Sequence, residues 1–220
     1  MPAYLESSLL SAFPWATHGF GTRHIDPHPN NVSTLKQIHS NLVLLADHPG
    51  LLGEGDALIT DTPGLAISIR TADCYPILLA DTGNRVVGAV HAGWRGTASQ
   101  VVMKTLDKMT SEFGTDPKNI SAAIGPGIGV CCYEVGEDVS SHFGFAVRTH
   151  LDLASENRKQ LEKAGVLPQK IEALGDCTFC NAERFFSYRR EKEKAGRMTS
   201  FIMLRTEKRP ESRPENPAGN

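Results

Sequence analysis

The sequence has no long hydrophobic segment and no basic stretch at its N-terminus. Its longest apolar runs, such as residues 75–80, are far shorter than the roughly 20 residues that a membrane-spanning helix needs. No lysine or arginine precedes Arg23, and no sustained apolar stretch follows the first residues, so a cleaved export signal is not indicated. We therefore predict a cytoplasmic protein that does not associate with membranes.

The sequence also has little net charge. It contains 23 Lys and Arg against 25 Asp and Glu among 220 residues, a formal charge of −2. Nucleic acids and anionic membranes are bound mainly through an excess of positive charge. The balance therefore excludes a polyanion as the main partner, although a few arginines could still hold a single phosphate. It carries no information on the oligomeric state.

Cysteine is scarce, with five residues in the whole chain. An odd number of cysteines cannot all pair, and a reducing cytoplasm would keep the side chains as thiols. The cysteines are therefore expected to serve in core packing, metal binding or catalysis.

Short apolar runs that alternate with helical patterns favour an α/β fold, a single-domain layered α/β sandwich with a mixed β-sheet. Several of these runs are apolar at every position, which is typical of strands covered on both faces. The predicted strands are residues 42–46, 57–60, 65–70, 77–80, 85–91, 120–125, 170–174 and 198–204. The predicted helices are residues 97–113, 133–141 and 152–164.

The chain shows no internal repeat and no Pro/Ser-rich linker, so we assign residues 1–205 to one catalytic domain. Residues 206–220 combine three prolines with six charged residues and have no large apolar side chain. We expect them to form a disordered tail. The glycine-rich segments 50–55 and 125–129 are predicted to be loops, which often border functional sites.

Cys74 follows the predicted buried strand 65–70, and His91 ends the predicted buried strand 85–91. Consecutive strands are usually neighbours, which would place both side chains at one edge of one sheet. A thiolate beside an imidazole is either a nucleophile–base pair or part of a zinc site. His39 would complete three ligands and leave the fourth position of a catalytic zinc open. The alternative is a free buried cysteine with two hydrogen-bonded histidines.

Six ordered segments carry a resemblance to a known family. They are LKQIH at 35–39, GDALIT at 55–60, RTADCYP at 70–76, HAGWRG at 91–96, GPGIGVCCYEVG at 125–136 and FSYRR at 186–190. Together they resemble the YfiH family, formerly described as multicopper polyphenol oxidases or laccases and now as purine nucleoside phosphorylases. The resemblance covers roughly residues 17–204.

The resemblance implies a single catalytic zinc held by His39, Cys74 and His91. It also implies phosphorolysis of adenosine, inosine, guanosine and S-methyl-5'-thioadenosine, together with hydrolytic deamination of adenosine. Purine nucleosides and inorganic phosphate are therefore the expected partners. The implied fold is a layered α/β sandwich distantly similar to the catalytic domain of cytotoxic necrotizing factor toxins.

The older description as a laccase disagrees with the histidine content. A multicopper oxidase needs on the order of ten imidazoles, several of them in His-x-His pairs. The sequence has eight histidines and no His-x-His pair, so copper is disfavoured as the bound ion. The His-x-Glu and Pro-Cys-x-x-Cys pattern of the cytidine deaminases is absent as well.

Each expected reaction needs further groups. Deamination needs a proton donor for the departing ammonia, and Asp73, Glu134 and Cys74 itself are the nearest candidates in sequence. We therefore predict a catalytic role for Asp73 beside Cys74 and His91.

Phosphorolysis needs an anion site, and guanidinium groups bind phosphate oxygens in pairs. Arg95 is our first choice as a catalytic and substrate-binding residue, because it starts a predicted long helix whose N-terminal amides favour an anion. Arg70, Arg189 and Arg190 are the further candidates for substrate binding.

The other four cysteines are expected to be packing residues. Cys131 and Cys132 are adjacent, and adjacent thiols rarely bridge without strain. The Cys177-x-x-Cys180 segment is similar to half of a zinc ribbon, but its only companions are the vicinal pair, whose spacing is poor for tetrahedral coordination.

Two other functions stay open. Cys74 as nucleophile with His91 as base would make an amide hydrolase, for example one that edits peptidoglycan precursors, an activity also linked to the YfiH family. A metal-dependent interaction module without turnover is the other alternative. Tightly bound zinc would occupy the thiolate and argue against the nucleophile.

Overall fold

The computed structural model describes residues 4–25 and 29–206, so the tail predicted at residues 206–220 lies, except for Thr206, outside the described residues. The strands are β1 (Ala16–Phe20), β2 (Val32–Lys36), β3 (Val43–Leu45), β4 (Gly50–Glu54), β5 (Ala57–Thr60), β6 (Ala66–Thr71), β7 (Tyr75–Asp81), β8 (Val86–Ala92), β9 (Ile120–Ile124), β10 (Glu134–Val135), β11 (Thr149–His150), β12 (Ile171–Ala173) and β13 (Met198–Leu204). The α-helices are α1 (Ser8–Ser11), α2 (Trp94–Ala98), α3 (Val101–Phe113), α4 (Glu137–Ser140), α5 (Leu153–Lys163) and α6 (Tyr188–Glu191). Short 3₁₀ turns lie between these elements, at residues 117–119, 141–143, 168–170 and 192–194.

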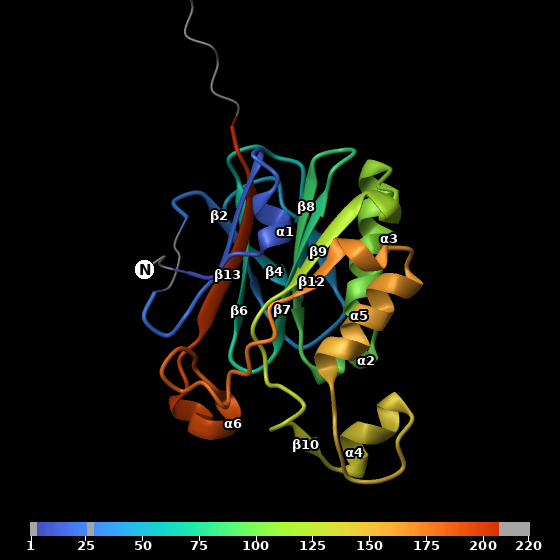
Figure 1. Ribbon diagram of the computed structural model, residues 1–220. Helices are drawn as coiled ribbons and strands as arrows, with labels where there is room; N and C mark the ends of the chain where they lie inside the picture. Colours follow the sequence, from blue (N-terminus) through green and yellow to red (C-terminus); the bar gives the residue numbers. More distant parts are fainter. Residues whose placement is uncertain (1–3, 26–28, 207–220) are drawn as a thin grey trace, which may run out of the picture.

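Three layers are stacked in the molecule (Figure 1). The outer sheet has the strand order β1-β13-β6-β2-β4, and the central sheet has the order β12-β9-β7-β8-β5-β3. Helices α3 and α5 form the third layer, on the face of the central sheet that is turned away from the outer sheet. Both sheets contain parallel and antiparallel pairs, which confirms the predicted mixed α/β sandwich.

The middle strands of the central sheet are buried because both of their faces are covered. In β7, Ile77 and Leu79 belong to the core under the helices, whereas Leu78 and Ala80 belong to the core between the sheets. Successive strand residues point to opposite faces, so a strand between two cores must be apolar at every position. The runs that lacked alternation in the sequence are therefore confirmed as buried strands.

The predicted long helix at 97–113 is broken into two helices. The five-residue α2 ends at Ala98, and α3 begins at Val101. Between them Gln100 has a φ of +64°, a left-handed conformation that a non-glycine residue rarely adopts. Arg95 therefore lies in a short helix and does not open the long one, which removes the helix N-terminus as an argument for an anion site there.

Other predicted elements were wrong in part. Segment 50–55 is largely strand β4, at the edge of the outer sheet, and not a loop. The predicted helix at 133–141 begins instead with strand β10, because Gly136 is extended and α4 starts only after it. Strands β1 and β2 were not predicted, since their short mixed sequences lack a clear period.

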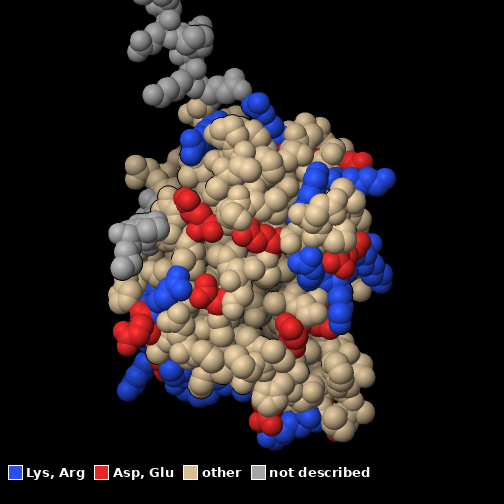
Figure 2. All heavy atoms as spheres, in the orientation of Figure 1, with Lys and Arg blue, Asp and Glu red and all other residues tan. Residues whose placement is uncertain are grey.

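The surface agrees with the small net charge. Figure 2 shows acidic and basic side chains interspersed over much of this face, with Lys and Arg gathered at the lower left, where Figure 1 places α6. Within the described part of the chain, no helix has the length and apolar content needed to cross a bilayer.

The strained residue between α2 and α3 yields a test. Glycine adopts the left-handed conformation without the Cβ clash, so Gln100→Gly is expected to raise the free energy of unfolding by about 0.5 kcal/mol. Lys104→Gly, at an exposed position within α3, is the matched control and should lower the free energy of unfolding by about 1 kcal/mol. Urea unfolding measures both; equal destabilisation by the two variants would contradict the assignment of strain to Gln100.

Candidate metal centre

The topology of the two sheets brings Cys74 and His91 together. Cys74 lies between β6, which belongs to the outer sheet, and β7, which belongs to the central sheet. Strand β7 pairs antiparallel with β8, and Pro76 lies opposite His91. Both side chains therefore lie where the middle strands of the central sheet end, on the same side of the sheet's length, as predicted. We expected the strand before Cys74 to lie beside the strand of His91. In the structure, the strand after Cys74, β7, pairs with β8 instead.

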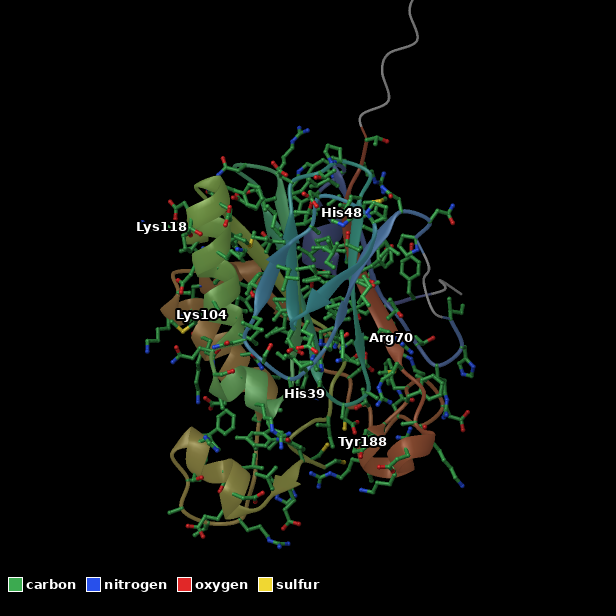
Figure 3. The ribbon with its side chains drawn as sticks, turned by 180° about the vertical axis from the view of Figure 1, so that it is seen from behind. His39, His48, Arg70, Lys104, Lys118 and Tyr188 are labelled. Carbon is green, nitrogen blue, oxygen red and sulfur yellow. The ribbon has the colours of Figure 1, made fainter. Side chains whose placement is uncertain are left out.

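His39 reaches the same place from the outer sheet. It lies in the turn that follows β2, and its backbone has a φ of +60°. Its ring centroid is 4.9 Å from that of His91, with the two rings inclined by 73°. The ligand atoms of His39, Cys74 and His91 all lie within 4.8 Å of one another. His91 is buried and His39 is exposed, so the group opens to solvent on the side of His39 (Figure 3).

Asp56, which is fully buried, holds both histidines in place. One carboxylate oxygen is 2.8 Å from His91 Nδ1 and also accepts the backbone N–H of His39 at 3.0 Å. The other accepts N–H groups of Ile38 and Ser40 and the Ser40 hydroxyl. Burial opposes the charge of Asp56, but the hydrogen bonds from His91 and Ser40 lower the pKa of the carboxyl to about 2.

The thiol and the imidazole stabilise each other's charge. Burial opposes ionisation of Cys74, but the positive charge of His91 and hydrogen bonds from His39 and His91 outweigh it and lower the pKa of Cys74 to about 6. Burial likewise disfavours the imidazolium, yet the Cys74 charge and the Asp56 hydrogen bond raise the pKa of His91 to about 9. The group therefore favours a thiolate, which is the form of cysteine that binds metals and attacks carbonyls.

Gly93 provides the space in which the three side chains meet. A Cβ at this position would lie 2.8 Å from Cys74 Sγ and 3.3 Å from His39 Cδ2. Real Cβ atoms do not approach other atoms at the first of these distances. The glycine between His91 and Trp94 in the HAGWRG segment is therefore required by close packing against the site.

Asp73, the predicted proton donor, is engaged elsewhere. Its buried carboxylate accepts hydrogen bonds from the Thr178 and Ser187 hydroxyls at 2.7 and 3.0 Å and from the Arg189 backbone N–H at 2.7 Å. Its backbone has a φ of +85°. In this arrangement Asp73 anchors the segment 178–189 beside Cys74.

Two of the four predicted arginines, Arg95 and Arg189, contact aromatic side chains. The Arg189 guanidinium is 5.3 Å from the ring centroid of Tyr133, and Arg95 lies 4.3 Å over the ring of Trp94. The charges of both arginines act on the Tyr133 hydroxyl, as does that of Cys74. Burial is the main reason why the pKa of Tyr133 is raised to about 12. Tyr133, Arg95 and Arg189 thus share one neighbourhood with Cys74.

The other two arginines have different partners. The Arg190 guanidinium donates to three backbone oxygens, those of Thr178, Phe179 and Phe185, and to the Glu191 carboxylate. It is therefore occupied in holding its own loop. Arg70 is exposed on β6, and its backbone pairs with the Gln37 amide. Neither residue has a contact in the structure that supports phosphate binding.

The remaining cysteines are not core residues. Cys131 and Cys180 are exposed, and Cys132 and Cys177 are half-buried, so the expected packing role is wrong. The four ligand atoms lie within 4.8 Å of one another, and the turn in which Cys132 and Tyr133 donate to the Gly129 carbonyl brings the vicinal pair to the Cys-x-x-Cys loop. Burial opposes ionisation of Cys177, but backbone N–H bonds from Cys180 and Gly129 lower its pKa to about 7.

Comparison with known proteins identifies the family of the chain and agrees with its architecture. A sequence model of the family described as "Multi-copper polyphenol oxidoreductase laccase" matches residues 21–205. The protein named "Purine nucleoside phosphorylase YfiH" of Escherichia coli is 37% identical over 187 residues, covering 80% of this chain and 75% of that protein. The chain belongs to the YfiH family.

Other YfiH-family relatives resemble nearly the whole chain. A protein of Deinococcus radiodurans named "Purine nucleoside phosphorylase" is 41% identical over 221 residues, covering 89% of this chain and 85% of that protein. The crystal structure of the hypothetical protein YfiH from Bacillus licheniformis superposes with a TM-score of 0.85 at 27% identity, over 93% of this chain and 97% of that one. The three-layer fold is therefore that of YfiH structures.

Sequence reasoning missed Asp56 and Tyr133 as site residues. A signal for Asp56 was present, because an ionisable residue directly before the apolar run 57–59 must find partners when it is buried. Tyr133 had no such signal, since only the fold brings the segment 129–133 close to Cys74.

The dependence on Asp56 is testable. Asp56→Asn would remove a buried charge, although five hydrogen-bond donors would still point at the side chain of residue 56. We therefore expect the free energy of unfolding to fall by about 3 kcal/mol. Asp47→Asn is the matched control, because Asp47 is exposed and pairs only with the neighbouring His48, and it should unfold like the parent protein. Denaturant unfolding measures both; an unchanged midpoint for Asp56→Asn would refute this role.

Proposed function

We propose that the chain is a zinc-dependent purine nucleoside phosphorylase that accepts adenosine, inosine, guanosine and S-methyl-5'-thioadenosine and also deaminates adenosine. The observation that carries the proposal is the convergence of His39, Cys74 and His91 on one point, in a chain whose relatives are named purine nucleoside phosphorylases. Phosphorolysis is the part supported by those names. The deaminase activity rests on the resemblance to the family.

The three side chains fit a zinc ion. Asp56 occupies His91 Nδ1, which leaves Nε2 of that ring as the ligand atom and fixes its direction. Two imidazoles and a thiolate are common zinc ligands, and a fourth position stays free for substrate or water. A zinc ion bound there would act as a Lewis acid on an oxygen of the substrate or on water.

Copper fits the chain less well as an oxidase centre. Two histidines and a cysteine can also hold a single copper ion, but a multicopper oxidase needs a separate histidine-rich cluster. Among residues 4–25 and 29–206, the only other cluster of potential metal ligands consists of four cysteines. We therefore assign zinc, and not copper, to His39, Cys74 and His91.

Phosphate binding is assigned to Arg95 and Arg189. Both guanidinium groups lie in the neighbourhood of Tyr133 and Cys74, and Arg189 is held there by its backbone bond to Asp73 and by its bond to the Glu134 carbonyl at 2.9 Å. Two guanidinium groups can bind the oxygens of one phosphate in pairs and hold it for attack on the ribose. Asp73 then acts by positioning Arg189.

The phosphate site can be tested by steady-state kinetics with inosine. Arg95→Ala would remove one charged donor pair, so we expect KM for phosphate to rise by roughly 10- to 100-fold. Arg148→Ala is the matched control, since Arg148 is exposed and its contact is a 3.7 Å ion pair with Glu134. An unchanged KM for phosphate in Arg95→Ala would show that the anion binds elsewhere.

Metal dependence is tested by removing the ion. The protein treated with a chelator is expected to lose release of hypoxanthine from inosine and phosphate by at least roughly 100-fold, and added zinc should restore it. Ammonia release from adenosine, followed in the same samples, reports the deaminase activity separately. Absence of both activities in a zinc-loaded, folded protein would refute the proposal and favour an interaction module.

One observation favours the alternative of an amide hydrolase. Cys74, His91 and Asp56 form a chain of thiolate, imidazole and carboxylate, which is the arrangement of nucleophile, base and orienting group in cysteine hydrolases. The same chelation experiment separates the two functions. A metal-free protein that hydrolyses peptidoglycan-precursor amides, and that zinc inhibits, would favour the hydrolase.

A further inference from the structure

A second cluster of cysteines lies on two loops outside the candidate centre. Cys131 and Cys132 precede β10, and Cys177 and Cys180 lie between β12 and α6. The Sγ atom of Cys180 is 3.6 Å from that of Cys131 and 3.2 Å from that of Cys132, and all four sulfur atoms lie within 4.8 Å of one another. The chain thus gathers four thiols from positions about fifty residues apart.

The separations of the sulfur atoms lie on either side of the value that a tetrahedral ion requires. With Zn–S bonds of about 2.3 Å, the sulfur atoms of a four-cysteine site lie about 3.8 Å apart. Core packing does not explain the cluster, because Cys131 and Cys180 are exposed. Disulfides do not explain it either, because all four cysteines are free thiols in the structure, and adjacent cysteines rarely bridge with each other.

Backbone amides around the cluster donate to one of its sulfur atoms. The amide of Gly129 donates to Cys177 Sγ at 3.2 Å, and the amide of Cys180 donates to the same sulfur. Such N–H bonds to a metal-bound sulfur neutralise part of its charge and fix its direction. A Cβ on Gly129 would lie 3.2 Å from Cys177 Cβ and 3.3 Å from Cys131 Sγ, so the close approach of the two loops depends on this glycine.

We propose that Cys131, Cys132, Cys177 and Cys180 bind a structural zinc ion. Four thiolates close the coordination shell, which is typical of structural zinc and leaves no position for a substrate. Four thiolates around a divalent ion would carry a net charge of −2. Arg190 donates to the carbonyls of Thr178 and Phe179, inside the Cys-x-x-Cys loop, and so brings a positive charge to this site. This ion is separate from the one assigned to His39, Cys74 and His91.

The proposed ion would fasten together two loops that reach the catalytic end of the molecule. The loop that carries Cys177 also carries Thr178, which donates to Asp73 next to Cys74. The loop that carries Cys131 and Cys132 continues into Tyr133, and its Ile128 amide donates to the Asp73 carbonyl. Both loops therefore contact the residue before Cys74, and a zinc between them would fix that contact.

Elemental analysis of the full-length protein, purified under reducing conditions, tests the proposal. We expect two zinc ions per chain in the parent protein and one in Cys177→Ser and in Cys132→Ser. Val130→Ala, in the same loop but without a thiol, is the matched control and should keep both ions. Equal zinc content in the parent protein and in folded Cys177→Ser would overturn the proposal.

Cobalt supplies a measurement that leaves the cluster intact. In Cys74→Ser, which lacks the thiolate of the other centre, bound Co²⁺ is expected to show the intense thiolate-to-cobalt absorption and visible bands of tetrahedral four-thiolate coordination. Absence of these bands in folded Cys74→Ser would refute the site, even if Cys177→Ser and Cys132→Ser failed to fold. One zinc in the parent protein and none in Cys177→Ser would support this site while refuting a catalytic zinc.

Discussion

The arrangement of the candidate centre depends on one buried carboxylate. Asp56 binds the turn of residues 38–40 through three backbone amides and holds His91 through its Nδ1 atom. A buried charge is tolerated only when donors surround it, and here those donors belong to the segments that carry two of the three ligands. The same interaction therefore stabilises the fold at this edge and sets the direction of the imidazole that faces Cys74.

A second buried carboxylate has the same role for another segment beside the centre. Asp73 takes its donors from Thr178, Ser187 and the Arg189 backbone, all in the segment that follows β12. Asp56 thus organises the ligands, whereas Asp73 organises the loop that carries an arginine of the proposed phosphate site. Two buried acidic groups with separate sets of donors explain how the loops around the centre keep a defined geometry.

The sequence predicted the fold best for strands that are buried on both faces. The central strands β5, β7 and β8 were predicted because every position must be apolar between two cores, and strand ends then located Cys74 and His91. Local patterns fail where the determining contact is distant. The break at Gln100 and the strand β4, at the edge of the outer sheet, depend on packing that no short window contains.

The same limit applies to the site. His39 entered the ligand set through spacing and family resemblance, and the structure then placed it beside His91. The four remaining cysteines were judged by their separation along the chain, which is a poor guide when a turn and a loop crossing bring two pairs together. Arg190 was grouped with Arg189 by adjacency, yet their guanidinium groups point to different partners.

The position of Cys74 between the two sheets has a thermodynamic consequence. His39 extends from the outer sheet, His91 belongs to the central sheet, and Cys74 lies on the crossover that joins them. An ion held by all three would cross-link the two sheets, in addition to the apolar core between them and the hydrogen bonds of Asp56. Its binding free energy would add to the cohesion of the sandwich, so the resistance of the protein to unfolding would increase with the concentration of free metal.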